Sequence, residues 1–282
     1  MASIPVVDSH LHLWDPGRLK YPWHKDVPAL NRKFLPQDYK RAHGNIEVKR
    51  MVFVQCEVDR DQSSDEVAFV TELAAAEPRI QGIVAFAPLE NGLAAKEDLA
   101  SLARNTLVKG IRRLIQSEDD GFCLQPKFIE GVQMLPDFGF TFDICIYHSQ
   151  LADAIKMVKR CPKVKFVLDH IGKPDIKSGT IEPWKSELKE LASLENVHCK
   201  LSGLITEADH RSWKPQDLEP YLVQAIECFG HDRLMFGGDW PVSTLAGSWQ
   251  QWHAALGNHL ATDSETDQLK VFHDNASSFY RL

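Results

Sequence analysis

Ile4-Pro5-Val6-Val7-Asp8-Ser9-His10-Leu11-His12 is the first apolar run of the chain, and it ends in a His-x-His pair. Side chains alternate across a β-strand, so residues two apart point the same way. If residues 4–8 form a strand, His10 and His12 leave its C-terminal end on one side. Two neutral imidazoles placed like this can bind one divalent cation, or they can jointly polarise one substrate oxygen.

The same layout recurs along the 282 residues, because strand-like runs rich in Val, Ile and Phe alternate with amphipathic, helix-like runs. The pattern predicts strands over 6–9, 50–55, 81–86, 108–112, 141–146, 165–169, 197–201 and 233–236. It predicts helices over 65–77, 94–105, 126–138, 150–161, 182–194 and 219–229, with closing helices over 263–282. Eight β-then-α units in a chain of this length favour a (β/α)8 barrel over a doubly wound sheet. We expect a single domain over residues 1–282.

Segment 14–39 is long and contains several prolines and aromatic residues. It directly follows the first predicted strand. We therefore expect a loop over the mouth of the barrel, whose aromatic side chains line a pocket or pack on the rim: Trp14, Tyr21, Trp23 and Phe34.

Composition narrows the function classes. The net charge is −7, which argues against a nucleic-acid partner, because phosphate binding needs clustered Lys and Arg. No apolar run approaches the roughly 20 residues of a membrane span, and no signal peptide precedes the first predicted strand. The six cysteines form no C-x-x-C pair and several lie in apolar runs, as expected of buried thiols in a reducing compartment. These features predict a cytoplasmic protein.

In barrels of this kind the chemistry gathers at the C-terminal ends of the strands, which converge on one axial pocket. Asp239 follows two glycines that allow close backbone approach, and this favours a functional carboxylate over a simple turn cap. His170, beside Gly172, is interpreted as a site residue rather than a hydrogen-bonded core histidine. Arg112 ends an inner strand, where it can hold a carboxylate or a carbonyl oxygen instead of forming a surface ion pair.

Other strand ends are candidates for substrate contact. His148 either faces the pocket or starts the next helix. Glu57 and Lys200 either contact substrate or serve as ion-pair partners of the site. Trp14 and Trp240 are aromatic candidates at the mouth. Asp8 is expected to brace the His-x-His turn.

Taken together, these segments resemble the amidohydrolase superfamily, most closely its branch of sugar-acid and dicarboxylate lactonases. The resemblance spans the chain from residue 6 to about 280 and rests on Val7-Asp8-Ser9-His10-Leu11-His12-Leu13-Trp14-Asp15, Tyr21-Pro22-Trp23, Leu168-Asp169-His170-Ile171-Gly172-Lys173-Pro174 and Phe236-Gly237-Gly238-Asp239-Trp240-Pro241. It implies a (β/α)8 barrel and water-mediated hydrolysis. By position it implies His10, His12, His170 and Asp239 as the metal-site residues, and Arg112 as the strand-4 arginine that faces the substrate.

One departure from the wider superfamily bears on the metal. Dinuclear members carry a carbamylated lysine at the end of strand 4, whereas this chain has Gly110-Ile111-Arg112 there, with Lys109 at the wrong place. The resemblance therefore implies one divalent ion at most, Zn²⁺ or Mn²⁺, and its lactonase branch also includes metal-free members. Without metal, the imidazoles and Arg112 must polarise the carbonyl directly.

The resulting hypothesis is a lactonase that opens a small sugar-acid lactone. Asp239 acts as general base toward water, with His170 and Arg112 as its catalytic partners. The first rival is a metal-dependent decarboxylase of the same superfamily. The second is a non-catalytic barrel that only binds a sugar acid. The expected partner is a small-molecule lactone, and the expected assembly is a monomer or a homodimer.

Overall fold

Eight parallel strands pair in the order β1 to β8 and form the wall of a barrel. The computed structural model describes residues 4–282. The strands are β1 (Val6–Leu11), β2 (Val48–Val54), β3 (Ile80–Ala85), β4 (Val108–Ile111), β5 (Thr141–Ile144), β6 (Phe166–Leu168), β7 (Val197–Leu201) and β8 (Leu234–Phe236). A parallel bridge between Leu11 and Trp240 joins the end of β1 to the residues after β8. The predicted (β/α)8 barrel is confirmed.

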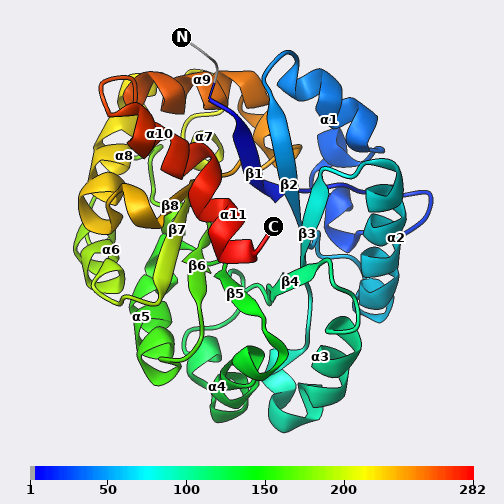
Figure 1. Ribbon diagram of the computed structural model, residues 1–282. Coiled ribbons are helices and arrows are strands. Elements are labelled where there is room, and N and C mark those ends of the chain that lie inside the picture. Colours follow the sequence, from blue (N-terminus) through cyan, green and yellow to red (C-terminus); the bar gives the residue numbers. More distant parts are fainter. Residues whose placement is uncertain (1–3) are drawn as a thin grey trace.

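Helices cover the outside of the barrel (Figure 1). They are α1 (Pro36–His43), α2 (Ser63–Ala76), α3 (Lys96–Leu102), α4 (Pro126–Gln133), α5 (Leu151–Arg160), α6 (Trp184–Ala192), α7 (Leu204–Glu207), α8 (Pro215–Phe229), α9 (Trp249–His259), α10 (Glu265–Leu269) and α11 (Asn275–Tyr280). All six helices predicted between the strands are present. The predicted helix over 126–138 is shorter than expected, because Pro136 lies in a separate 3₁₀ turn over Leu135–Phe138.

Three helices were not predicted from the sequence. The segment expected to be a loop to residue 39 becomes α1 at Pro36, where the Asp38 carboxylate accepts from the Leu35 N–H at 3.0 Å. Helix α9 begins after Ser248, whose hydroxyl accepts from the Gln251 N–H at 3.1 Å. That capping box was readable in the sequence. Helix α7 is a single turn, too short to show a periodic pattern.

The C-terminal helix α11 covers the N-terminal end of the barrel. Asn275 donates to the Leu234 carbonyl at the start of β8 at 2.7 Å, and Arg281 donates to the Gly139 carbonyl ahead of β5 at 2.7 Å. In Figure 1 this helix (red) lies across the centre of the barrel. Phe279 and Tyr280 pack against inward-facing strand residues: Val7, Val52, Val54, Val84, Val167 and Met235. Since α11 occupies this end, the C-terminal strand ends form the mouth of the barrel.

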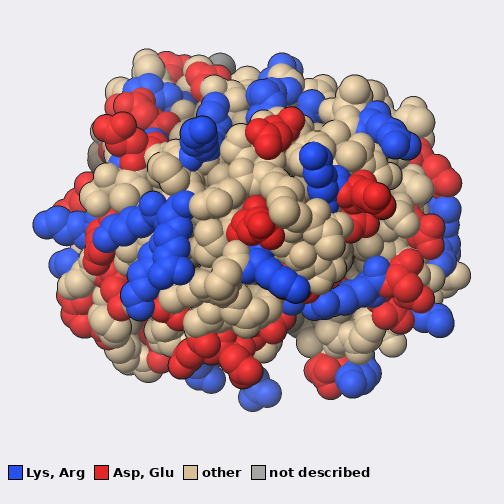
Figure 2. Space-filling model, turned by 90° about the horizontal axis from the view of Figure 1, so that it is seen from below, with Lys and Arg blue, Asp and Glu red and all other residues tan. Residues whose placement is uncertain are grey.

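The surface carries both signs of charge. On the face shown in Figure 2, basic side chains lie among acidic ones, in keeping with the net charge of −7. A mixed surface of this kind gives little attraction for a polyanion. Within residues 4–282, no helix is both long and apolar enough to cross a membrane.

His253 on α9 provides a test of the packing outside the barrel. Its ring stacks on Trp249 at 5.3 Å between centroids, and burial lowers its pKa to about 4. The unfolded chain takes up this proton near the ordinary value of 6.5, whereas the folded chain does so only near pH 4. Stability that is present above pH 6.5 is therefore lost as the pH falls. The free energy of unfolding therefore falls between pH 7 and pH 4.5. We expect this fall to be roughly 2 kcal/mol smaller in His253→Phe than in the parent protein.

Urea unfolding at the two pH values measures this difference, with the exposed His210→Phe as the control variant. An identical pH dependence in His253→Phe and the parent protein would contradict the expectation.

Candidate active site

The buried carboxylate of Asp8 on β1 fixes the end of that strand, where His10 and His12 lie. Its Oδ1 accepts from the backbone N–H of His10 at 3.1 Å and from that of Gly238 at 2.8 Å. Its Oδ2 accepts from the Tyr39 hydroxyl at 2.7 Å and from the Trp249 indole at 2.8 Å. The expectation that Asp8 braces the His-x-His turn is confirmed. Asp8 also fixes the β8 loop against that turn.

Three imidazoles converge on one carboxylate oxygen at the barrel mouth. Asp239 Oδ1 lies 3.5 Å from His12 Nε2, 3.8 Å from His10 Nε2 and 4.0 Å from His170 Nε2. All four side chains are buried, although they come from three different strand ends. The barrel thus brings together the four predicted metal-site residues.

The Nδ1 atom of each ring, which is the nitrogen farther from Asp239, has its own partner, and these partners orient the rings. His12 Nδ1 donates to the Val54 carbonyl at 2.7 Å, which leaves the lone pair of His12 on Nε2. His170 Nδ1 lies 2.8 Å from the Ser202 hydroxyl. His10 Nδ1 faces Asp169 Oδ1 at 3.3 Å. The Nε2 atoms of all three rings therefore point toward Asp239.

Burial keeps the His10 and His170 rings neutral at pH 7. It lowers the pKa of His170 to about 4 and the pKa of His10 well below its ordinary value. Burial by itself would raise the pKa of Asp239, but the neighbouring histidines lower it below its ordinary value. The pocket thus holds an ionised carboxylate beside neutral imidazoles.

This donor set fits a single divalent cation. Ligand atoms of His10, His170 and Asp239 all lie within 4.8 Å of one another. Imidazole nitrogen and carboxylate oxygen are common ligands of zinc, and ligating histidines usually hold their second nitrogen in a hydrogen bond, as His12 and His170 do. His12 supplies a third imidazole next to the same carboxylate oxygen.

A second group of donor atoms, Cys145, Asp169 and His170, is unsuited to another ion. Asp169 already lies 3.0 Å from the Lys200 ammonium and 3.2 Å from the Arg112 guanidinium. Because these two positive groups already pair with the Asp169 carboxylate, the carboxylate is not available as a ligand for a second cation. The arrangement agrees with the expectation of one ion at most.

Arg112 lies directly after β4, at the strand end where the sequence predicts an arginine that faces the substrate. The residue is 4 % exposed, and one Nη lies 3.3 Å from His10 Nε2. The other Nη donates to the Gln55 carbonyl. The guanidinium is therefore fixed beside the imidazole cluster, where it can also meet a substrate oxygen.

Lys200 lies deeper than a substrate-binding residue would. It is fully buried, and its Nζ lies 2.6 Å from Asp143 Oδ2 and 3.3 Å from His10 Nδ1. Of the two roles considered for Lys200, the structure places it in that of an ion-pair partner beneath the site. The analysis of the sequence missed Asp143, although a carboxylate inside the apolar run Phe142-Asp143-Ile144 is itself a signal, because a buried charge needs a partner.

The two tryptophans predicted to bind substrate support the walls of the mouth. Trp14 is fully buried, and its indole N–H already donates to the Leu30 and Arg32 carbonyls. Trp240 is 3 % exposed and packs against Phe34 at 5.4 Å between centroids. Since neither ring is open to solvent, we assign both to the packing of the mouth rather than to substrate contact.

Glu57 and His148 do lie at the rim. Glu57 is exposed after β2, and its carboxylate accepts from the Gln55 amide at 2.8 Å. His148 is half-buried after β5 in a short 3₁₀ turn, and its Nδ1 donates to the Lys173 carbonyl at 3.0 Å. His148 thus both faces this rim and begins a turn, so the two alternatives for it are compatible.

Backbone strain gathers at the same strand ends. Among residues 4–282, seven non-glycine residues have positive φ, and five of them follow β2, β6 or β8. These five are Glu57 (51°), His170 (54°), Ile171 (48°), Lys173 (49°) and Asp239 (50°). Such conformations cost about 1–3 kcal/mol each and persist where surrounding contacts enforce them, often at functional sites.

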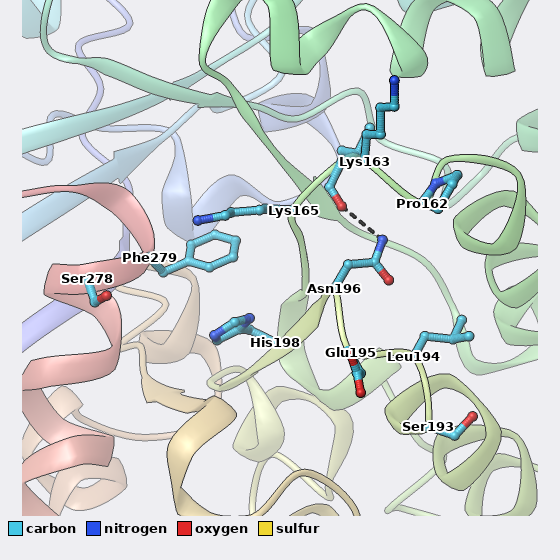
Figure 3. Close-up of a pocket in the computed structure, with 11 residues that line it drawn as sticks. Pro162, Lys163, Lys165, Ser193, Leu194, Glu195, Asn196, His198, Ser278 and Phe279 are labelled. Carbon is cyan, nitrogen blue, oxygen red and sulfur yellow. Dashed lines mark hydrogen bonds between the residues drawn. The ribbon is translucent and has the colours of Figure 1, made fainter.

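A surface hollow lies at the opposite end of the barrel, beside α11 (Figure 3). It has a volume of about 650 Å³ and is lined by residues such as Lys163, Lys165, Asn196, His198 and Phe279. None of its lining residues belongs to the histidine cluster, so the hollow is separate from the candidate active site.

A (β/α)8 barrel with three histidines and one aspartate at its C-terminal end is typical of enzymes whose site can hold a metal ion. The sequence profile of the family described as amidohydrolase matches residues 7–282. The chain belongs to this amidohydrolase family.

Among relatives, an L-fucono-1,5-lactonase from Burkholderia ambifaria is 32% identical over 287 residues, covering 98% of this chain and 95% of that protein. An L-rhamnono-gamma-lactonase from Scheffersomyces stipitis is 23% identical, with both chains fully covered. A crystal structure of a Burkholderia multivorans amidohydrolase with bound zinc has a TM-score of 0.89 and 32% identity, covering 98% of this chain and 99% of that one. A 2,6-dihydroxybenzoate decarboxylase with a TM-score of 0.64 and 15% identity, both chains fully covered, shares the fold.

Gly203 permits the close approach of His170. A Cβ atom at position 203 would lie 2.5 Å from His170 Nδ1, and the residue has a φ of +65°. We expect Gly203→Ala to displace the His170 ring and to weaken zinc binding at least tenfold, as other disruptions of a ligand's support do. Competition with a chromophoric chelator measures the affinity.

Gly139→Ala is the matched control, because Gly139 has a φ of +74° and open space around its Cβ position. Both variants carry the backbone strain, but only Gly203→Ala pushes on the site. Equal zinc affinities in the two variants would argue against this role of Gly203.

Proposed function

We propose that the protein is a hydrolase that opens the ester bond of a small sugar-acid lactone with an activated water. The observation that carries the proposal is the convergence of three imidazoles on the Asp239 carboxylate at the barrel mouth. The amidohydrolase family and the lactonase names of its relatives support the choice of a lactone as substrate. A lactone is an activated ester and needs a nucleophilic water, a base and a positive group for the developing oxyanion.

Asp239 takes the water proton in this mechanism. Its carboxylate stays ionised at neutral pH, and its Oδ1 faces the pocket formed by the three imidazoles. As the ring opens, the proton taken up by Asp239 passes to the leaving alkoxide. The water adds its oxygen to the carbonyl carbon, the carbonyl carbon–ring oxygen bond breaks, and the open-chain hydroxy acid leaves.

The remaining polar side chains orient the lactone. Arg112, held beside His10, meets the carbonyl oxygen, where negative charge develops during attack. His170 is kept in place by Ser202 and faces the same oxygen atom of Asp239. Glu57 and His148 at the rim contact the ring hydroxyls of the substrate.

A divalent ion, Zn²⁺ or Mn²⁺, would be held by His10, His12, His170 and Asp239. Such an ion lowers the pKa of a bound water and polarises a carbonyl. The zinc in the Burkholderia multivorans structure supports zinc as the first choice. If the enzyme works without an ion, the imidazoles and Arg112 polarise the carbonyl.

The wider biological setting is part of the same proposal. We propose a single catalytic domain and a cytoplasmic location, since the six cysteines are all free and five of them are buried. A monomer or a homodimer remains the expected assembly. A decarboxylase shares the fold, but the lactonase relatives are more similar to this chain and favour hydrolysis.

Replacing the proposed base gives a direct prediction. Asp239→Asn keeps the shape of the side chain but removes the proton acceptor, and we expect turnover to fall at least about a thousandfold with the fold intact. Initial rates with a pH indicator measure the loss. Asp232→Asn, which changes an exposed aspartate paired with Lys270, is the control and should keep parental activity. Substantial turnover by Asp239→Asn would remove Asp239 from the role of base.

A substrate panel tests the function itself. We expect acid release from at least one sugar-acid 1,4- or 1,5-lactone, loss of that activity with chelator, and recovery with Zn²⁺ or Mn²⁺. Activity that survives chelation, in protein shown by metal analysis to contain no ion, would establish the metal-free mechanism. Acid release from none of the lactones, together with CO₂ release from an aromatic acid, would replace the lactonase with the decarboxylase.

A further inference from the structure

The C-terminal helix α11 places a tyrosine hydroxyl inside the barrel. Tyr280 is fully buried, and its hydroxyl donates to Asp143 Oδ2 at 2.7 Å. The ring packs on Phe279 at 4.9 Å between centroids. A side chain from the helix that covers the N-terminal end of the barrel thus reaches a buried charge on β5.

From Asp143 a continuous series of polar contacts leads toward the mouth. Asp143 Oδ2 lies 2.6 Å from the Lys200 ammonium. The same ammonium lies 3.0 Å from Asp169 Oδ1 and 3.3 Å from His10 Nδ1. Asp169 Oδ1 in turn faces His10 Nδ1 at 3.3 Å. Three contacts therefore connect the hydroxyl of Tyr280 with the ring of His10.

The charges in this group balance. Asp143 and Asp169 carry two negative charges, and Lys200 and Arg112 carry two positive ones, all at 4 % exposure or less. Burying four charges is costly, and well-packed apolar side chains often give equal or greater stability. A role in positioning the site accounts for such a group better than stability does.

Lys200 is the shared member, because its ammonium lies between the two carboxylates. The Tyr280 hydroxyl satisfies part of the acceptor capacity of Asp143 Oδ2. Without that donor, Asp143 competes more strongly for Lys200. The ammonium then moves toward Asp143, and Asp169 loses the partner that fixes its Oδ1 against His10.

We propose that Tyr280 is a positioning residue for His10, acting through Asp143, Lys200 and Asp169. The group holds the His10 proton on Nδ1 and directs the Nε2 lone pair toward Asp239. The catalytic use of His10 rests on the proposed function, but the orientation of its ring does not. The helix that covers one end of the barrel thereby contributes to the geometry at the other end.

Tyr280→Phe is a sharp test, because it removes only the hydroxyl. The aromatic packing on Phe279 stays, and so does a ring whose centroid lies 5.5 Å from Lys200 Nζ. Tyr221→Phe is the matched control, since the Tyr221 hydroxyl bonds only backbone carbonyls of Asp175 and Thr180, at 3.4 and 3.3 Å. Both variants lose one phenolic hydroxyl, but only Tyr280→Phe touches the charge group.

Three readouts follow each variant. Nitrogen-15 NMR of the metal-free protein, with the His10 signals assigned by their loss in His10→Gln, reports which ring nitrogen carries the proton. Chelator competition gives the affinity for zinc ion. Lactone hydrolysis gives kcat and KM separately. For Tyr280→Phe we expect a changed His10 spectrum, about tenfold weaker zinc binding and about tenfold lower kcat, with KM within about twofold.

An unchanged His10 spectrum in folded Tyr280→Phe, or the same changes in Tyr221→Phe, would overturn the proposal. If Tyr280→Phe does not fold, Asp143→Asn carries the test from the opposite direction, because it removes the pull of Asp143 on Lys200 and lets the ammonium move toward Asp169. A parental His10 spectrum in that variant would show that the position of Lys200 does not affect His10, and it overturns the proposal equally. A protein that hydrolyses no lactone still reports through the NMR spectrum. The absence of lactone hydrolysis would therefore contradict the proposed function, whereas an unchanged His10 spectrum would contradict this inference.

Discussion

Closure of the barrel between β8 and β1 is the constraint on which the site depends. The Asp239 N–H donates to the His10 carbonyl at 2.8 Å, and the His12 N–H donates to the Trp240 carbonyl at 2.8 Å. The first bond joins the proposed base directly to His10, and the second joins His12 to the residue that follows the base. Asp8 strengthens the same seam by accepting from backbone N–H groups on each side. The seam that completes the fold therefore also sets the distances within the candidate active site.

Electrostatics in the barrel are arranged in two layers. The upper layer holds the imidazoles of His10, His12 and His170 around Asp239, at the mouth of the barrel. The lower layer holds compensated charges, in which Lys200 separates Asp143 from Asp169. Burial by itself would raise the pKa of Asp169, but Lys200 and His10 lower it well below its ordinary value. The lower layer thus places a carboxylate oxygen of Asp169 3.3 Å from His10 Nδ1.

Much of the architecture was predictable, because strand and helix periodicities are local properties. All eight strands lie within a few residues of their predicted ranges, and the pairing order follows from alternating β and α units. The helices that were not predicted show where hydrophobic periodicity fails to indicate a helix. Helix α7 has four residues, and α1 lies in a segment whose prolines and aromatics read as a loop. Pro36 in fact occupies the first turn of α1, where proline is well tolerated.

The sequence alone determined which residues could do chemistry. His10, His12, His170, Asp239 and Arg112 stand at strand ends, and parallel strands in a barrel bring such ends together. Only the tertiary structure decided how deeply each side chain is buried and which other side chains it contacts. Lys200 lies near the end of β7 and Trp14 follows β1, yet both are fully buried, and one partner of Asp143 comes from a helix 137 residues away. Strand position is encoded locally, whereas burial and pairing depend on side chains that meet only when the barrel closes.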